Sequence, residues 1–88
     1  MSFLIFLHPK AARALQKLER QVASEMKNKL KELESRPESG KKLRYSDCWS
    51  LRVGDYRAIY EVDRGEKKVV VLFIGHRKNV YDDFLKLF

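Results

Sequence analysis

Several kinds of residue are scarce in this chain, and each shortage excludes a class of protein. A single cysteine, Cys48, allows neither a disulfide within the chain nor a zinc site of the Cys-x-x-Cys type. The two histidines, His8 and His76, are far apart and no Cys-His or His-x-His spacing occurs, so we expect no metal and no cofactor. The apolar runs at 3–7 and 69–74 are much shorter than the roughly 20 residues of a membrane span. We therefore expect an unexported, cytoplasmic protein without a membrane partner.

Acidic residues are also in short supply. Lys and Arg total 19 against 12 Asp and Glu, which gives a net charge of +7 on 88 residues. Such an excess favours a polyanionic partner, with nucleic acid ahead of a membrane surface. Glycine is scarce as well, and the sequence has no Gly-rich phosphate loop and no Gly-x-Ser-x-Gly elbow. Any catalysis must therefore use arginine, lysine, tyrosine or histidine.

The apolar pattern divides the chain into a strand, a helical region, three strands and a short helix. Residues 3–7 are apolar throughout, which is typical of a strand buried on both faces. From Pro9 to Leu33 apolar residues recur every three or four positions, as one helix or as a hairpin of two. Residues 49–53 and 56–62 alternate as strands, residues 69–74 form a central strand, and residues 79–88 have helical spacing. We predict a single α+β domain over residues 1–88, with helices on one face of a largely antiparallel sheet.

Gly54 and Asp55 predict a tight turn that brings two arginines together. Glycine at the first central position suits a type II′ hairpin, and this register sets Arg52 directly opposite Arg57 on one face. Directly opposed like charges destabilise a hairpin by up to about 1 kcal/mol, and an anion between them would remove the conflict. The alternative is that both arginines extend into solvent, or pair with Asp55 and Glu61.

Two further basic segments are candidates for nucleic-acid binding. Gly75-His76-Arg77-Lys78 follows the central strand, where a rigid element can hold side chains toward a ligand, although a solvated basic loop has the same pattern. Before the hairpin, basic and aromatic residues interleave as they do at single-stranded nucleic-acid sites, namely Lys41, Lys42, Arg44, Tyr45 and Trp49. Trp49 alternates in phase with Leu51 and Val53, which favours a place in the core.

Two segments resemble a known family. Residues 51–62, LRVGDYRAIYEV, and residues 70–81, VVLFIGHRKNVY, closely resemble the RelE branch of the RelE/ParE toxin superfamily. With the helical region and residues 43–49, the resemblance covers nearly the whole chain. It implies a helical hairpin on one side of a curved antiparallel sheet, with a C-terminal helix. It thus implies two helices where the periodicity alone does not divide one.

The resemblance also implies an activity. RelE-like toxins are ribosome-dependent endoribonucleases, or mRNA interferases, which cut message in the ribosomal A site and so inhibit translation. Carried over by position, the catalytic residues are Arg52, Arg57, Arg77 and Tyr81. The residues expected to bind RNA and the ribosome are Lys41, Lys42, Arg44, Tyr45, His76 and Lys78. A second strand lysine of some members falls at Ser50 here, and the spacer from Arg77 to Tyr81 is shorter than in some relatives.

Partners and alternatives follow from the same resemblance. The implied partners are the ribosome with its mRNA, and a cognate RelB-like antitoxin, acidic and built of amphipathic helices, in a toxin–antitoxin hetero-oligomer. We expect the antitoxin to cover or displace residues 79–88. One alternative is a ParE-like inhibitor of DNA gyrase on the same fold. The other is a module that occupies the ribosome or RNA without cutting.

Overall fold

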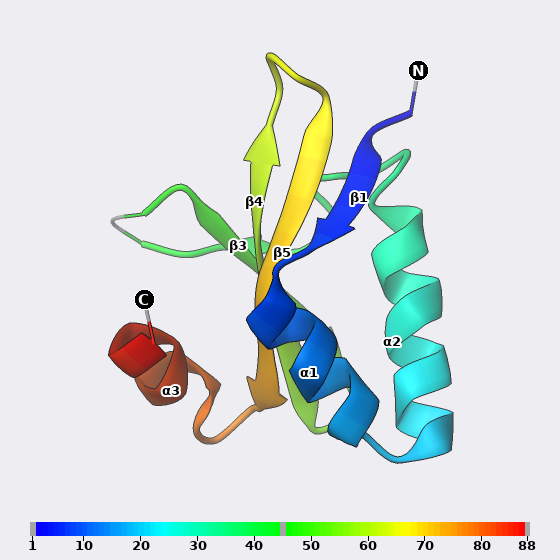
Figure 1. Ribbon diagram of the computed structural model, residues 1–88. Coiled ribbons are helices and arrows are strands. Elements are labelled where there is room, and N and C mark those ends of the chain that lie inside the picture. Colours follow the sequence, from blue (N-terminus) through cyan, green and yellow to red (C-terminus); the bar gives the residue numbers. More distant parts are fainter. Residues whose placement is uncertain (1, 45, 88) are drawn as a thin grey trace.

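The computed structural model describes residues 2–44 and 46–87. Its elements, in chain order, are β1 (Leu4–Leu7), α1 (Pro9–Lys17), α2 (Arg20–Glu32), β2 (Lys41–Lys42), β3 (Cys48–Val53), β4 (Tyr56–Asp63), β5 (Lys68–His76) and α3 (Val80–Leu87). The strands form one sheet in the order β1-β5-β4-β3-β2 (Figure 1). Strands β3, β4 and β5 are the predicted antiparallel meander, so the α+β prediction is confirmed.

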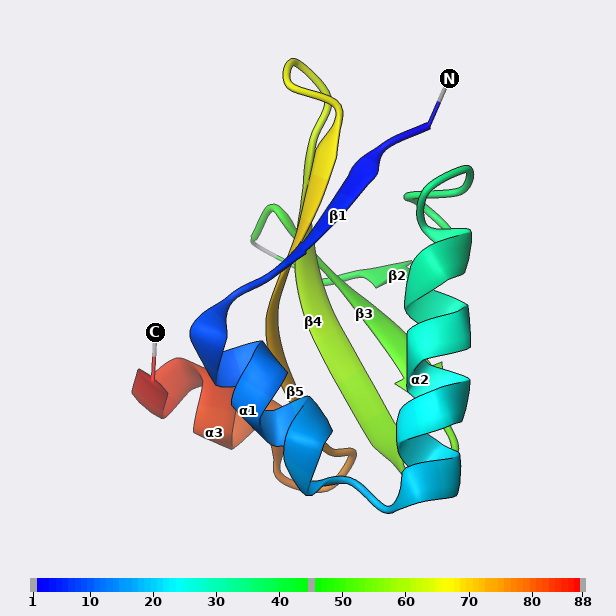
Figure 2. The ribbon, with the colours of Figure 1, turned by 45° about the vertical axis from the view of Figure 1, so that its right-hand side comes forward.

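The helical region is two helices, as the family resemblance implies. Leu18 and Glu19 have extended backbones, with ψ of 150° and 146°, and they separate α1 from α2. The amide of Leu18 donates to the carbonyl of Leu15 and closes the last turn of α1. This break lets the helices take different directions, with α1 against β5 and α2 against β3 (Figure 2).

Both helices pack their apolar stripe on one face of the sheet. The buried core there consists of Ala11, Leu15, Met26, Leu30, Leu33, Leu51, Val53, Ala58, Tyr60, Val69, Val71 and Ile74. Trp49 is half-buried at the edge of this core and stacks on Tyr60, with ring centroids 6.5 Å apart. Because neighbouring residues of a strand point to opposite faces, this core fixes which side chains of β3 and β4 point away from it.

The prediction that residues 3–7 form a strand buried on both faces is wrong. Strand β1 lies at the edge of the sheet and pairs with β5 alone, in parallel. Ile5 packs against the core, whereas Leu4 and Phe6 are 64% and 48% exposed. A run of apolar residues indicates that these side chains are buried from water, but it does not show whether the rest of the chain or a partner buries them.

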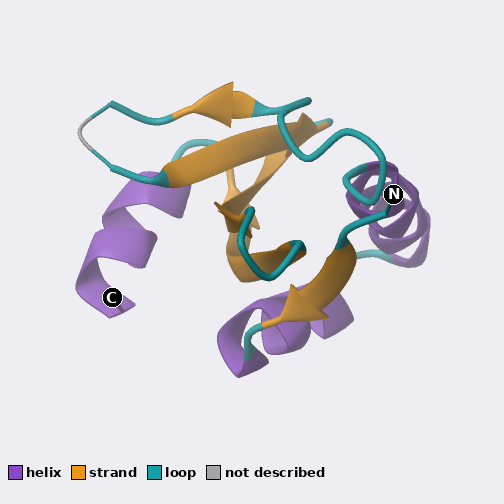
Figure 3. Cartoon of the chain, turned by 90° about the horizontal axis from the view of Figure 1, so that it is seen from above, coloured by secondary structure: helices purple, strands orange, loops and turns teal. Residues whose placement is uncertain are grey.

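The prediction that all helices share one face holds for α1 and α2 and is wrong for α3. Val80 is fully buried, and a side chain added at Gly75 would come within 3.2 Å of it. Gly75 is paired with Arg57, whose neighbour Ala58 points into the core, so α3 packs on the other face. Viewed from above, α3 and the two N-terminal helices lie on different sides of the strands (Figure 3).

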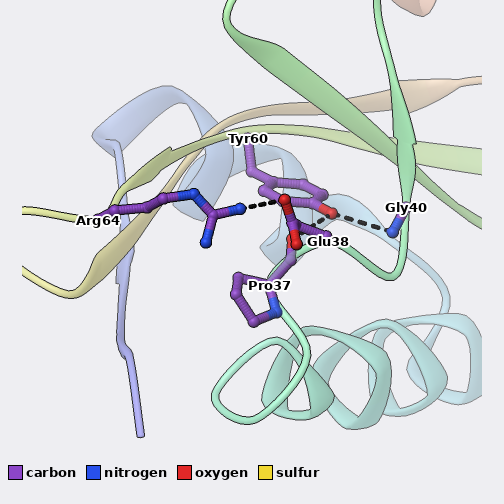
Figure 4. Close-up of polar contacts among 5 residues, drawn as sticks. All are labelled: Pro37, Glu38, Gly40, Tyr60 and Arg64. Carbon is purple, nitrogen blue, oxygen red and sulfur yellow. Dashed lines mark hydrogen bonds and ion pairs between the residues drawn. The ribbon is translucent and has the colours of Figure 1, made fainter.

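The loop from α2 to β2 is tied to the sheet by Tyr60 (Figure 4). The Tyr60 hydroxyl accepts a 3.1 Å hydrogen bond from the amide of Gly40 and donates one of 2.9 Å to the carbonyl of Pro37. Burial raises the pKa of Tyr60 above its usual value. A side chain at Gly40 would clash with a carbonyl oxygen of β3. On the exposed side of the loop, Glu38 forms an ion pair with Arg64. This loop therefore sets β2 against β3.

Candidate functional site

The β3–β4 hairpin has the predicted register. Gly54 has a φ of +58°, as the first central residue of a type II′ turn requires. Arg52 is paired directly with Arg57 across the ladder. Both arginines alternate along their strands with residues of the core, so they lie on the face that carries α3.

Side chains from three elements meet on this face. Nη1 of Arg57 on β4 donates a 3.1 Å hydrogen bond to Oγ of Ser50 on β3. The hydroxyl of Tyr81 on α3 donates to the same Oγ at 3.2 Å. Ser50 is buried, Arg57 is half-buried and Tyr81 is 38% exposed. Two residues expected from the sequence to be catalytic are thus brought together at one serine.

Arg52 and Arg77, the other two residues expected from the sequence to be catalytic, lie at the turn of the β3–β4 hairpin. Nε of Arg52 donates a 2.9 Å hydrogen bond to the carbonyl of Gly54. Arg77 forms an ion pair with Asp55, with Nε and Oδ1 3.5 Å apart. In the described part of the chain neither Arg52 nor Arg57 has a carboxylate partner. The alternative in which both hairpin arginines pair with acids is therefore wrong, and Arg77 takes the Asp55 carboxylate instead.

His76 lies apart from this cluster. It is paired with Tyr56 across the ladder, and the two rings meet edge to face with centroids 5.5 Å apart. Tyr56 packs against the core, so His76 points to the face that carries α1 and α2. Nδ1 of His76 accepts a hydrogen bond from the amide of Lys78, whose side chain is exposed. His76 therefore shapes the turn after β5 and does not share a face with Arg57.

The basic residues before β3 divide between the two faces. Lys41 is paired with Ser50, and Lys42 is paired with the residue that precedes Ser50 on β3. Lys41 is thus the one of the two that shares the face of the arginines. Arg44 is exposed in the loop that follows, and Tyr45 lies outside the described residues.

Ser50 is the site residue that reasoning from the sequence missed. In the sequence it stands only as a departure from a lysine of some relatives. The sequence does indicate that Ser50 lies at the site, because Ser50 and Arg52 are two positions apart on one strand and must share a face. Ser50 is also paired with Ile59, two residues from Arg57, which is a diagonal distance that an arginine side chain spans.

A separate groove of about 760 Å³ carries charges of both signs. Its charged lining residues are Glu38, Lys42, Asp47, Glu61, Asp63, Arg64 and Lys68. Four carboxylates beside three cations do not favour a polyanion. The face with Arg52 and Arg57 is therefore the better candidate for a nucleic-acid site.

Metal and thiol chemistry find little support among residues 2–44 and 46–87. In that part of the chain no group of three His, Cys, Asp or Glu is placed to hold a metal ion. Burial raises the pKa of the Cys48 thiol, and the Glu61 carboxylate raises it further. The thiol is therefore protonated at neutral pH and a poor nucleophile.

None of the helices described here is both long and apolar enough to cross a membrane.

Comparison with known families defines the class of protein. The family described as ParE toxin of type II toxin–antitoxin system, parDE, matches residues 5–81. The chain belongs to this family, within the RelE/ParE superfamily that the sequence resembles. No curated protein sequence matches the chain significantly.

Solved structures of RelE toxins are similar over most of the chain. A variant of E. coli toxin RelE with two arginines replaced by alanine, in the free state, is 26% identical with a TM-score of 0.82 and covers 99% of this chain and 98% of its own. The matching chain of the RelBE2 toxin–antitoxin complex from Mycobacterium tuberculosis is 28% identical, with a TM-score of 0.77. The match covers 88% of this chain and 100% of that chain. The matching chain of the archaeal RelE–RelB complex from Pyrococcus horikoshii OT3 is also 28% identical, with a TM-score of 0.77. That match covers 88% of this chain and 97% of the other. The resemblance to RelE seen in the sequence is confirmed.

Proposed function

We propose that this protein is a ribosome-dependent endoribonuclease that cuts mRNA in the ribosomal A site and so inhibits translation. The observation that carries the proposal is the contact of Arg57 and Tyr81 at Ser50, with Arg52 and Arg77 beside the same hairpin. The guanidinium group is permanently charged and its planar fork matches a phosphate. The similarity to RelE toxins supports the same function.

The chemistry we propose uses the RNA's own 2′-hydroxyl as nucleophile. The 2′-oxygen loses its proton and attacks the adjacent phosphorus, the bond from phosphorus to the 5′-oxygen breaks, and that oxygen takes up a proton. Arg52 and Arg57 stabilise the charge on the pentacoordinate phosphorus, and Arg77 stabilises the leaving oxygen. Tyr81 either accepts the proton of the 2′-hydroxyl or stacks on a base. The products are a 2′,3′-cyclic phosphate and a 5′-hydroxyl.

These residues form an incomplete catalyst, which is why the proposal includes the ribosome. The site is an open face, on which Tyr81 is 38% exposed. Holding the message in a reactive geometry can contribute several kcal/mol, roughly 7 or more in favourable cases. We propose that the exposed cations Lys41, Arg44 and Lys78 hold the toxin on RNA, whereas Lys42 and His76 lie on the other face of the sheet.

Mapping RNA ends in cells that express the protein tests the proposal. We expect breaks inside translated codons, at a fixed position relative to the reading frame, and none in untranslated transcripts. Stalled ribosomes without RNA breaks would instead indicate a module that binds without cutting.

A second candidate function is favoured by one observation, the match to a family described by its ParE toxin. A ParE-like inhibitor of DNA gyrase would use the same fold with the arginines as surface groups. Its signature is DNA breaks linked to gyrase, with intact message. The same cells therefore distinguish the two functions.

We propose that the partner is a RelB-like acidic antitoxin in a hetero-oligomer. The similar structures include RelE–RelB complexes, and a charge of +7 complements an acidic chain. Exposed apolar side chains at the two ends of the fold, Leu4, Phe6 and Leu85, fit the apolar face of an amphipathic helix. We expect the antitoxin to cover or displace α3. Hydrogen exchange checks this expectation, which fails if α3 is as protected as β5 in both free and bound toxin.

A further inference from the structure

The hydroxyl of Ser50 is a polar group in a position that normally carries an apolar one. Ser50 is 1% exposed, and it is the one buried residue of the described chain that is not hydrophobic. It lies between buried Leu51 on its own strand and buried Ile59 on the next. A hydroxyl in such a place costs free energy unless it has hydrogen-bond partners.

Both partners of this hydroxyl belong to the proposed catalytic set. Oγ of Ser50 accepts from Nη1 of Arg57 at 3.1 Å and from the hydroxyl of Tyr81 at 3.2 Å. A serine oxygen has two lone pairs and one hydrogen, so it accepts both bonds and keeps its own hydrogen to donate. Among the described residues Oγ of Ser50 is therefore not left without a hydrogen-bond partner.

The two contacts run in different directions. Arg57 reaches Ser50 diagonally across the β3–β4 ladder, within the sheet. Tyr81 reaches it from α3, which packs on top of that face through Val80. Ser50 is therefore the point at which the position of α3 is set against the hairpin.

We propose that Ser50 is a positioning residue whose hydroxyl holds the Tyr81 phenol beside the Arg57 guanidinium. Its small size is part of this role, because a longer side chain at position 50 would occupy the place where the other two meet. Ser50 touches neither the RNA nor the reacting phosphate, and it acts through Tyr81. The catalytic part of this role rests on the proposed nuclease function, whereas the hydrogen bond by which Ser50 holds α3 on the sheet does not.

A double-mutant cycle tests the proposal, with Ser50→Ala, Tyr81→Phe and the two combined. The matched control is Ser24→Ala, which removes an exposed hydroxyl on α2. Cleavage is measured on ribosomes in single turnover, at saturating and at half-saturating toxin. Ser50→Ala should lower the saturated rate by about tenfold, the scale of one lost hydrogen bond at a positioned group, and change the half-saturating concentration less than about twofold. In the Tyr81→Phe background the same substitution should cost less than about twofold.

Hydrogen exchange of the α3 amides gives a second readout that needs no cleavage. Loss of one hydrogen bond between α3 and the sheet should speed exchange by about fivefold in Ser50→Ala and in Tyr81→Phe, with no further gain in the combined variant. A chain that cuts no RNA refutes the nuclease proposal, and the exchange data alone then decide the hold on α3. An equal loss of rate with and without the Tyr81 hydroxyl, or unchanged α3 exchange in Ser50→Ala, would overturn the assignment of Ser50.

Discussion

The amide of Arg77 donates a 2.7 Å hydrogen bond to the carbonyl of Asp55, and its guanidinium Nε lies 3.5 Å from the Asp55 carboxylate. These contacts tie the segment after β5 to the turn between β3 and β4. The backbone bond fixes where Arg77 leaves the sheet. The carboxylate holds its side chain at the hairpin, where a phosphate group would compete with Asp55 for it.

We predict that Asp55→Asn strengthens ribosome binding without weakening the fold. Both side chains of the ion pair are substantially exposed, so its contribution to stability is small, about 0–1 kcal/mol. Removing the competing carboxylate should tighten binding by up to about fivefold at low salt, and less at high salt. Glu66→Gln removes the same charge in an exposed turn elsewhere and serves as the control. Weaker binding in Asp55→Asn, or equal gains in both variants, would contradict the role of Asp55.

We predict that Arg57→Ala and Arg77→Ala each lower the cleavage rate by on the order of 10² or more, the scale of one lost charge donor in a preorganised site. Ribosome binding should weaken only a few-fold, because the other basic residues still contact phosphate. The measurements are single-turnover cleavage and ribosome co-sedimentation. Arg20→Ala, at an exposed position of α2, should cleave at the wild-type rate. A tenfold or greater loss in that control would show that net charge, and not the site, sets the rate.

Substitutions of Tyr81 separate its two possible roles. If the hydroxyl accepts the proton of the 2′-hydroxyl, Tyr81→Phe should lose as much activity as Tyr81→Ala, about 10²-fold or more. If the ring stacks on a base, Tyr81→Phe should lose only about tenfold, through the same hydrogen bond that Ser50→Ala removes, and Tyr81→Ala should lose more. Wild-type rates in both variants would remove Tyr81 from the site.

We predict that Tyr60→Phe destabilises the fold while leaving the chemistry in place. It removes the partner of the Gly40 amide and the Pro37 carbonyl, which should lower the free energy of unfolding by about 1–3 kcal/mol. Tyr56→Phe is the matched control. Urea unfolding at neutral pH measures both variants, and an equal loss in the two would contradict the role of the Tyr60 hydroxyl.

The same tyrosine makes stability depend on pH. Burial raises the pKa of Tyr60 in the folded chain, so the folded state holds this proton more tightly than the unfolded state. The stabilisation is fully present below the ordinary tyrosine pKa, about 10, and is lost as pH rises through the folded value. Unfolding free energies between pH 8 and 11 should therefore fall more steeply for wild type than for Tyr60→Phe. Parallel curves would contradict this linkage.

Chelation tests the expectation that arginines, and not a metal ion, stabilise the phosphate. Cleavage should continue in EDTA under conditions where a control translation reaction shows the ribosome intact. Loss of cleavage that is restored by a divalent ion, with the ribosome unaffected, would contradict the proposed chemistry.

Local patterns predicted the parts of the fold that depend on neighbours in sequence. Gly54 defined the turn, and the two-residue period of β3 and β4 then placed Arg52 opposite Arg57. Apolar periodicity placed the helical face, but it could not divide α1 from α2. The division occurs at Leu18 and Glu19, where no glycine or proline marks it, between a helix that packs on β5 and one that packs on β3.

Features that depend on distant segments were missed or wrong. Leu4 and Phe6 look like core residues in the sequence, and only the parallel edge position of β1 explains their exposure. Ser50 looks like an ordinary strand residue, because its partners come from β4 and from α3, the latter 31 positions away. A local pattern cannot show on which face a C-terminal helix will pack, and the site at Ser50 depends on that choice.

The most direct test of the central claim is single-turnover cleavage of a defined message on purified ribosomes by wild type and by the Arg57→Ala, Arg77→Ala double variant. We predict that wild type cuts within the A-site codon and leaves a 2′,3′-cyclic phosphate or its 3′-phosphate hydrolysis product. The double variant should still bind the ribosome and make essentially no cuts. Cleavage by the double variant at the wild-type rate, or intact message with wild type bound to the A site, would contradict the account.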